Sequence, residues 1–171
     1  LDSPNRKIVG IDLAHPDPAA WKTVVAEAPE ALEQAALIGG RIVCGYLVDV
    51  ESRLSLFDVN GRPEGTIDLP AAGTVSGISG REDTSEIFYS FTSPLYPSTI
   101  FGYDPATGTS AAFEAAPAPV DVSEYETQRM FATSKDGTQV PFFLTARKGL
   151  ARDGTHPTMM YGYGGFSITL S

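Results

Sequence analysis

The sequence predicts an almost entirely β fold: about two and a half four-stranded blades of a β-propeller, followed by the opening strands of a second domain. Two observations predict it. An apolar strand ending in aspartate recurs at Asp12, Asp58 and Asp104, at equal intervals of 46 residues. A last apolar run, 157–160, leads into a glycine-rich aromatic loop outside that repeat. Equal spacing of this length, with strands throughout, is typical of propeller blades.

Each repeat joins the strand before the aspartate to a second strand after a turn. The paired strands are 8–12 and 21–25, 54–58 and 65–69, and 99–104 and 109–113. Each aspartate lies where a hairpin begins, and its carboxylate can accept hydrogen bonds from turn amides there. We therefore predict a structural role for all three aspartates, because separate blades do not bring them together as a catalytic carboxylate pair.

Two further strand candidates lie between the repeats in each case and complete four strands per blade. They are 33–38 and 41–48, on either side of Gly39-Gly40, and 74–78 and 86–92, on either side of a polar loop. The chain is therefore predicted to hold two full blades and the last half of another. A closed propeller needs about four to eight blades, so we expect preceding residues or a partner chain to complete the ring.

Composition and charge argue against several partners and sites. Lys and Arg total 12 against 21 Asp and Glu, and the net charge of -9 argues against nucleic acid or an anionic membrane surface as partner. The single cysteine, Cys44, lies in an apolar run and is predicted to be a buried, inert thiol. The sequence has no zinc-type Cys/His cluster and no apolar run as long as a membrane span.

The second domain is predicted to begin after an Ala/Pro-rich stretch at 115–119, whose composition is typical of a linker. The 46-residue register stops there. The predicted division is 1–118 for the propeller blades and 119–171 for the second domain.

Strand signals of another kind follow this boundary. Strands are predicted at 127–133 and 138–146, joined as a hairpin by an Asp136-Gly137 turn. Pro141 restricts its strand to an edge or to a bulge, because proline has no N–H to donate to a neighbouring strand. The apolar run at 157–160 is predicted to be a buried strand.

The motif Tyr161-Gly162-Tyr163-Gly164-Gly165-Phe166 is the most informative stretch of the chain. Three glycines among three aromatic rings indicate that the backbone passes close to another group while the rings line it. In α/β-hydrolases a glycine-rich loop after an early strand supplies part of the oxyanion hole. A hairpin followed by a buried strand is also how such a sheet commonly opens. On the motif alone, a glycine turn with aromatic core residues has equal weight.

The chain resembles the prolyl oligopeptidase family of serine peptidases. The resemblance rests on Ser134-Lys135-Asp136-Gly137-Thr138, Lys148-Gly149, His156-Pro157, the stretch 86–94 and above all the motif at 161–166. It runs along essentially the whole chain and corresponds to an internal slice, from the late propeller blades into the start of the catalytic domain. It implies a β-propeller capping an α/β-hydrolase domain that cleaves short peptides on the carboxyl side of proline.

The resemblance also assigns two positions of the motif. It implies that Tyr163 donates its hydroxyl to the oxyanion, where a preorganised donor is worth roughly 3–4 kcal/mol. It implies that Phe166 helps to line the pocket for the substrate proline, since a flat apolar ring suits stacking against a pyrrolidine. Without the resemblance, Tyr163 would be interpreted as a core tyrosine and Phe166 as a packing residue. Tyr161 is expected to pack within the core.

The nucleophile of such an enzyme is not found in this sequence. There is no G-x-S-x-G elbow, and neither His15 nor His156 has a plausible serine or acid partner, so both are interpreted as structural. The resemblance implies that the triad lies downstream of Ser171 and that this segment alone is inactive. It further implies no metal or organic cofactor, a monomer, and short proline-containing peptides and the remainder of the same polypeptide as partners.

Two alternatives remain open at this point. The first is the oligopeptidase branch that cuts after Lys or Arg. That branch has serine and tyrosine where this chain has Gly165 and Phe166, which favours the proline-specific branch. The second is a non-catalytic propeller used as an interaction surface. The segment leaves open whether the protein is cytoplasmic or periplasmic.

Overall fold

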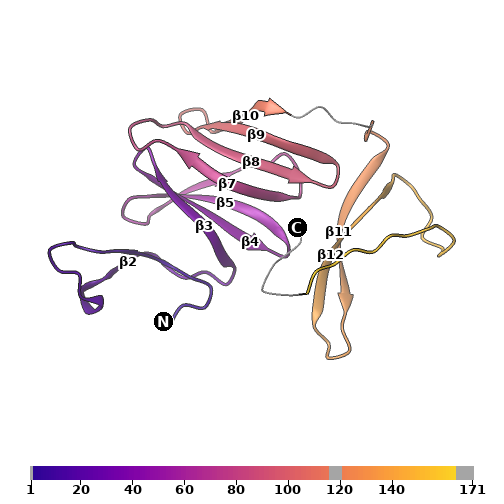
Figure 1. Ribbon diagram of the computed structural model, residues 1–171, viewed down its shortest axis with the longest axis horizontal. Coiled ribbons are helices and arrows are strands. Elements are labelled where there is room, and N and C mark those ends of the chain that lie inside the picture. The colour runs from indigo at the N-terminus through magenta and orange to yellow at the C-terminus, as the bar shows by residue number, and fades with distance from the viewer. Residues whose placement is uncertain (1, 116–120, 165–171) are drawn as a thin grey trace.

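The computed structural model describes residues 2–115 and 121–164, which form four antiparallel sheets in chain order (Figure 1). The first sheet is a hairpin of β1 (Ile8–Gly10) and β2 (Lys22–Val25). Its connecting loop contains a short 3-10 helix, η1 (Pro18–Ala20), whose N-cap residue Asp17 accepts a hydrogen bond from the backbone N–H of Ala19. This hairpin is the predicted half-blade.

Two four-stranded sheets follow, and they confirm the predicted blades. The first blade has the order β3-β4-β5-β6, with bounds Ala31–Ile38, Arg41–Val48, Glu51–Asp58 and Pro63–Ile67. The second has the order β7-β8-β9-β10, with bounds Thr74–Gly80, Ile87–Ser93, Tyr96–Asp104 and Thr109–Ala115. Strands consecutive in sequence are neighbours in space, as in a propeller blade. The chain is therefore a mostly β, partial β-propeller in this region.

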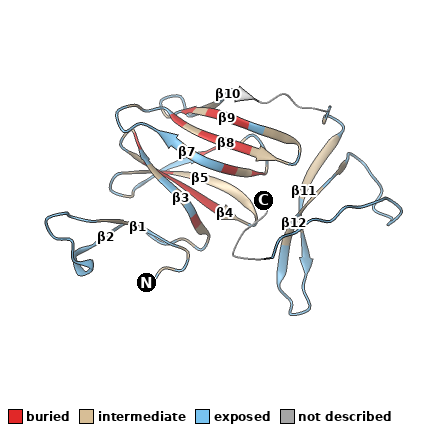
Figure 2. Cartoon of the chain, in the orientation of Figure 1, coloured by how far each residue is buried: buried red, intermediate tan, exposed pale blue. Residues whose placement is uncertain are grey.

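The core lies in the two interfaces between successive sheets. β4 is buried on both faces: Ile42, Cys44 and Tyr46 face the half-blade cluster, while Val43 belongs to the cluster shared with the second blade. Alternate residues of a strand point to opposite faces, so a strand between two neighbouring sheets is apolar at nearly every position. Figure 2 shows buried residues along β4, β8 and β9. Each fully buried large side chain contributes about 1.5–3 kcal/mol.

Hydrogen bonds join the two full blades at the start of β7. The Ser52 backbone N–H donates to the Gly73 carbonyl at 2.9 Å, and the Val75 N–H donates to the Ser52 hydroxyl at 2.9 Å. The Gln34 amide donates to the Val75 carbonyl at 3.1 Å. Because Val75 is buried, these bonds are worth more than exposed ones, and their loss would leave polar groups unsatisfied. Ser52, at the beginning of β5, is therefore held firmly against the next blade.

The three repeated aspartates have the predicted structural role. The carboxylates of Asp12, Asp58 and Asp104 each accept a hydrogen bond from the backbone N–H two residues later, at 2.9, 2.8 and 2.8 Å. Asp58 also accepts from the Arg62 N–H, and this bond is the main reason why its pKa lies below the ordinary value. The prediction that the aspartates begin the hairpins is confirmed.

His15 departs from its prediction in one respect. Its Nδ1 lies 3.1 Å from Asp12 Oδ2, so it has the acid partner that the sequence analysis did not expect. The two residues are three apart in one exposed turn, where the Asp12 carboxylate folds back toward the imidazole. This side-chain hydrogen bond is the main cause of the lowered pKa of Asp12.

The predicted hairpin after the linker is confirmed. β11 (Tyr125–Thr133) and β12 (Gln139–Arg147) pair over nine residue pairs without a bulge. The Thr138 N–H donates to the Asp136 carboxylate at 3.1 Å, and Gly137 has φ +87°, a conformation that favours glycine. Pro141 of β12 lies opposite Phe131 of β11. The other edge of β12 pairs with no strand of the described part, so Pro141 is on an edge strand, as predicted.

The strand predicted at 157–160 is wrong. These residues have no strand conformation, and the side chains of Met159 and Met160 are 93% and 95% exposed. A strand needs the backbone of a neighbouring strand to satisfy its N–H and C=O groups. None of the described residues lies beside 157–160 in that way. The beginning of an α/β-hydrolase sheet therefore stays a prediction. No helix in residues 2–115 and 121–164 has the length and hydropathy to cross a membrane.

Candidate functional site

The hairpin β11–β12 carries the segment that leads to the aromatic-glycine motif. Immediately after β12, the Lys148 backbone N–H donates to the Glu124 carbonyl at 2.8 Å, and the Lys148 ammonium donates to the Ser123 carbonyl at 2.7 Å. The Arg152 guanidinium donates to the Gln128 side-chain oxygen and lies 3.6 Å from the Met130 sulfur. The loop that follows β12 is thus bound through Lys148 to the residues just before β11 and through Arg152 to β11 itself.

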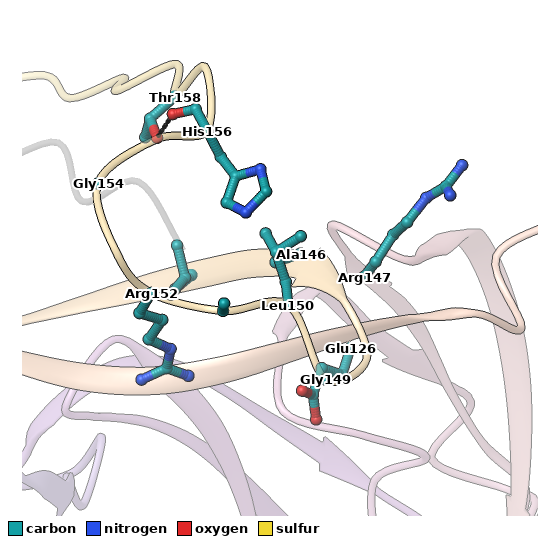
Figure 3. Close-up of a pocket in the computed structure, with 11 residues that line it drawn as sticks. Glu126, Ala146, Arg147, Gly149, Leu150, Arg152, Gly154, His156 and Thr158 are labelled. Atoms are coloured by element: carbon teal, nitrogen blue, oxygen red, sulfur yellow. Dashed lines mark hydrogen bonds between the residues drawn. The ribbon is translucent and has the colours of Figure 1, made fainter.

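A cavity of about 500 Å³ lies between this loop and the hairpin (Figure 3). Its lining combines charged and apolar side chains: Glu126, Leu144, Ala146, Arg147, Gly149, Leu150, Ala151, Arg152, Gly154, His156 and Thr158. Figure 3 shows the His156 ring above Leu150, with the two arginine side chains extending away from it on either side.

The chemistry of this cavity is limited. The Tyr125 hydroxyl accepts a hydrogen bond from the Arg147 guanidinium at 3.4 Å, and this bond raises the pKa of Arg147 further above its ordinary value. Among the lining residues, the side-chain hydroxyl belongs to Thr158, and it donates to the His156 backbone carbonyl at 3.1 Å rather than to the imidazole. No described nucleophile is therefore hydrogen-bonded to the His156 ring. The described residues therefore do not form a complete hydrolytic site around His156.

Tyr163 lies beyond this loop and is 49% exposed. No described residue forms a hydrogen bond with its hydroxyl, which leaves the phenol free as a donor within the described part of the chain. A Cβ added at Gly162 or Gly164 would meet no atom within 4 Å. The close approach expected at these glycines is therefore not made by the described residues and stays a prediction.

Two other residues of the motif have different outcomes. Tyr161 was expected in the core but is 80% exposed, so that prediction is wrong. The physical reason is the same as for 157–160, since no layer of the described structure covers this segment. Phe166, the predicted wall of the proline pocket, lies outside the described residues.

Cys44 has the environment predicted for it. The thiol is fully buried in the cluster between the half-blade and the first blade. Burial is the main cause of its raised pKa, and burial also raises the pKa of the neighbouring Tyr46 to about 12. Over residues 2–115 and 121–164, no group of three or more His, Cys, Asp or Glu side chains is placed to hold a metal ion.

One contact was missed in the sequence analysis. Arg129 of β11 lies against the turn between β4 and β5, with its Nη1 atom 3.5 Å from Glu51 Oε1 and 3.9 Å from Asp49 Oδ2. An ion pair between residues so far apart in sequence leaves no local pattern. A single sequence by itself offers no signal that would have found it.

The chain matches the family model for the N-terminal β-propeller domain of prolyl oligopeptidase over residues 1–116. Among curated proteins it is 36% identical to a prolyl endopeptidase of Elizabethkingia meningoseptica and 34% identical to one of Elizabethkingia miricola. Each alignment covers 99% of this chain and 24% of the relative. The chain therefore spans about a quarter of the length of these relatives.

Solved structures give the same result. A structure from a study of two prolyl endopeptidases superposes with a TM-score of 0.87 at 36% identity, over 95% of this chain and 24% of the other. Prolyl oligopeptidase B of Galerina marginata, bound to a 35-residue hydrolysis and macrocyclization substrate, superposes with a TM-score of 0.83 at 26% identity. That match covers 96% of this chain and 23% of the other.

Proposed function

Because the chain belongs to the prolyl oligopeptidase family, we propose that it is part of a serine peptidase that hydrolyses short peptides on the carboxyl side of proline. The observation that carries the proposal is the order of its parts. Propeller blades that match the family model are followed by a hairpin and then by the motif Tyr161 to Phe166. Two prolyl endopeptidases align over both parts in one continuous match.

The proposed mechanism is acyl transfer through a serine nucleophile and a histidine base supplied by the remainder of the polypeptide. This segment, the start of the catalytic domain from residue 119 on, supplies Tyr163 to the oxyanion and Phe166 to the proline pocket. The position of Tyr163 within the motif, in a segment over which two prolyl endopeptidases align, supports this role. A phenol side chain has few rotatable bonds, so its hydroxyl can be held in one position before the reaction. A donor held in this way stabilises the negative charge that develops on the substrate oxygen.

The first test is Tyr163→Phe in the complete protein. Removing one oxyanion donor lowers kcat by about 10²–10³-fold in comparable sites, and we expect that loss with KM little changed on a short chromogenic proline peptide. Tyr161→Phe is the matched control, since it removes a hydroxyl two residues away in the same motif, and it should keep nearly full kcat. An unchanged kcat for Tyr163→Phe would remove this tyrosine from the mechanism.

Substrate preference separates the proposal from its alternatives. Proline and arginine peptides of equal length are compared by kcat/KM, and faster cleavage after proline supports the proposal. Faster cleavage after arginine would place the protein in the Lys/Arg-specific branch. Phe166→Ala should raise KM for the proline peptide by about tenfold, because it removes an apolar contact worth 1–3 kcal/mol. No cleavage of either peptide by the complete protein would favour the non-catalytic module.

A further inference from the structure

The turn between β4 and β5 has an unusual backbone. Asp49 and Val50 both have positive φ, at 47° and 67°, and Val48 pairs with Glu51 across them. A two-residue turn of this shape normally contains Asn-Gly or Asp-Gly. A β-branched residue with positive φ is an outlier that persists only where the surroundings hold it. The bonds of the adjacent Ser52 to Gly73 and Val75 supply that support.

This turn presents two carboxylates to a single arginine of the hairpin. The Arg129 side chain is 35% exposed and that of Glu51 is 26% exposed, so solvent is partly excluded from their contact. Both distances are those of ion pairs, at 3.5 and 3.9 Å. The guanidinium also lies 5.9 Å from the centre of the Phe131 ring on the same face of β11. No other ion pair between described residues joins the hairpin to a blade.

The opposite face of β11 holds the loop that leads to Tyr163. Successive residues of a strand point to opposite faces, so Gln128 and Met130 lie on the other side from Arg129. Both of them contact Arg152 of that loop. β11 therefore lies between the β4–β5 turn of the propeller, on one face, and the loop that contains Arg152, on the other (Figure 1).

We propose that Arg129 is a positioning residue: its ion pairs to Asp49 and Glu51 fix the hairpin on the propeller and so fix the segment that carries Tyr163. The inference rests on the proposed function, since positioning matters through the oxyanion donor. A donor must be held within a fraction of an ångström to stabilise the transition state. Partly exposed ion pairs are screened by salt, so this positioning weakens as ionic strength rises.

The test uses the complete protein with Arg129→Met, and with Asp49→Asn and Glu51→Gln combined. Amide hydrogen exchange of the peptide covering 148–158 should become about two- to fivefold faster in both variants, which is the range expected for a partly exposed ion pair. On a proline peptide, kcat should fall by a similar factor with KM nearly unchanged. Raising NaCl from about 0.05 to 0.5 M should slow the wild type and leave Arg129→Met unaffected.

Two further variants complete the design. Arg129→Lys keeps the charge and should retain part of the wild-type kcat. Arg81→Met removes an exposed arginine that pairs with Asp83 within one loop of the second blade, and it should change neither exchange nor kcat. If Arg129→Met lowers the melting temperature, the double variant Asp49→Asn with Glu51→Gln tests the same contact while Arg129 is still present.

The outcomes are distinguishable. Exchange and kinetics equal to those of Arg81→Met overturn the proposal. Faster exchange with unchanged kcat also overturns it, because the contact would then hold the hairpin without positioning Tyr163. Hydrogen exchange does not depend on activity, so unchanged exchange overturns the inference even if the protein cleaves no proline peptide. A complete wild-type protein that cleaves no proline peptide would overturn the proposed function, independently of the exchange result.

Discussion

Burial controls the chemistry of Cys44. Its thiol has no exposed surface and lies between two sheets. Burial raises its pKa by disfavouring the thiolate, which outweighs the opposite effect of the hydrogen bond with Tyr46. The thiolate is the reactive form of cysteine, so both access and ionisation oppose modification.

We expect the Cys44 thiol to react at least about a hundredfold more slowly with a disulfide reagent in the folded complete protein than in guanidinium, because reaction requires local opening. Mass mapping of the labelled peptide assigns the signal to Cys44, whatever other thiols the complete protein contains. Equal labelling rates in the folded and unfolded states would contradict the buried position.

Two of the aspartate turns contain a glycine with positive φ, and only one of these glycines lies against a neighbouring sheet. Gly61 and Gly108 donate their N–H groups to the carbonyls of Asp58 and Asp104 and have φ values of +83° and +70°. A Cβ at Gly61 would overlap the carbonyl oxygen of Val24 in the half-blade, whereas a Cβ at Gly108 meets nothing within 4 Å. The two glycines therefore have the same backbone conformation, but only Gly61 is packed against the half-blade.

Gly108→Ala should lower the free energy of unfolding by about 1 kcal/mol, which is the usual cost of a left-handed conformation for a residue with a Cβ. Gly61→Ala should cost about 1–3 kcal/mol more, because the clash with backbone cannot be relieved by a rotamer change. Urea unfolding of the two variants measures the difference. Equal losses would show that the half-blade does not contact the turn at Gly61.

The elements themselves follow from local sequence patterns. Alternation places Ile87, Tyr89 and Phe91 on one face of β8, and the aspartate turns fix where the strands reverse. The hairpin β11–β12 formed as predicted because an Asp-Gly turn specifies its register. The run at 157–160 is apolar but forms no strand. Apolar side chains favour burial, but a strand also needs the backbone of a neighbouring strand, and no described residue provides one.

Acidic turns across the whole molecule share one electrostatic property. Hydrogen bonds from turn N–H groups or from neighbouring side chains lower the pKa of Asp12, Glu30, Asp58, Asp83, Asp121, Asp136 and Asp153. Five of the seven are exposed, and Glu30 and Asp58 are half-buried, so solvent screens each effect and keeps it small. They act in the same direction, because each folded carboxylate releases its proton at a lower pH than the unfolded one.

Stability should therefore decrease as the solution is acidified. The contribution of these carboxylates is complete above the unfolded pKa values of about 4 and is lost as the pH falls through the lower folded values, since the unfolded state then binds more protons. The urea midpoint of the complete protein should fall between about pH 6 and pH 3. Asp58→Asn should reduce this slope slightly. A midpoint that rises on acidification would contradict the assignment.

The amino-acid sequence by itself determined the β character, the blade repeat, the hairpin with its Asp136-Gly137 turn and the buried position of Cys44. Each is specified by residues close together in the chain: period-two alternation, turn-forming aspartates and an apolar run long enough for one strand. The motif at 161–166 likewise indicated a family and two candidate site residues, Tyr163 and Phe166, whose roles stay predictions.

Only the tertiary structure decided which surfaces have neighbours. It left Tyr161 and residues 157–160 exposed, and it brought Arg129 to the strained turn at Asp49 and Val50. Burial and long-range ion pairs depend on the backbone geometry of segments far apart in sequence, and no short pattern encodes that geometry. The position of Tyr163, the proposed oxyanion donor, would likewise be set by such a contact if Arg129 fixes the hairpin on the propeller as we propose.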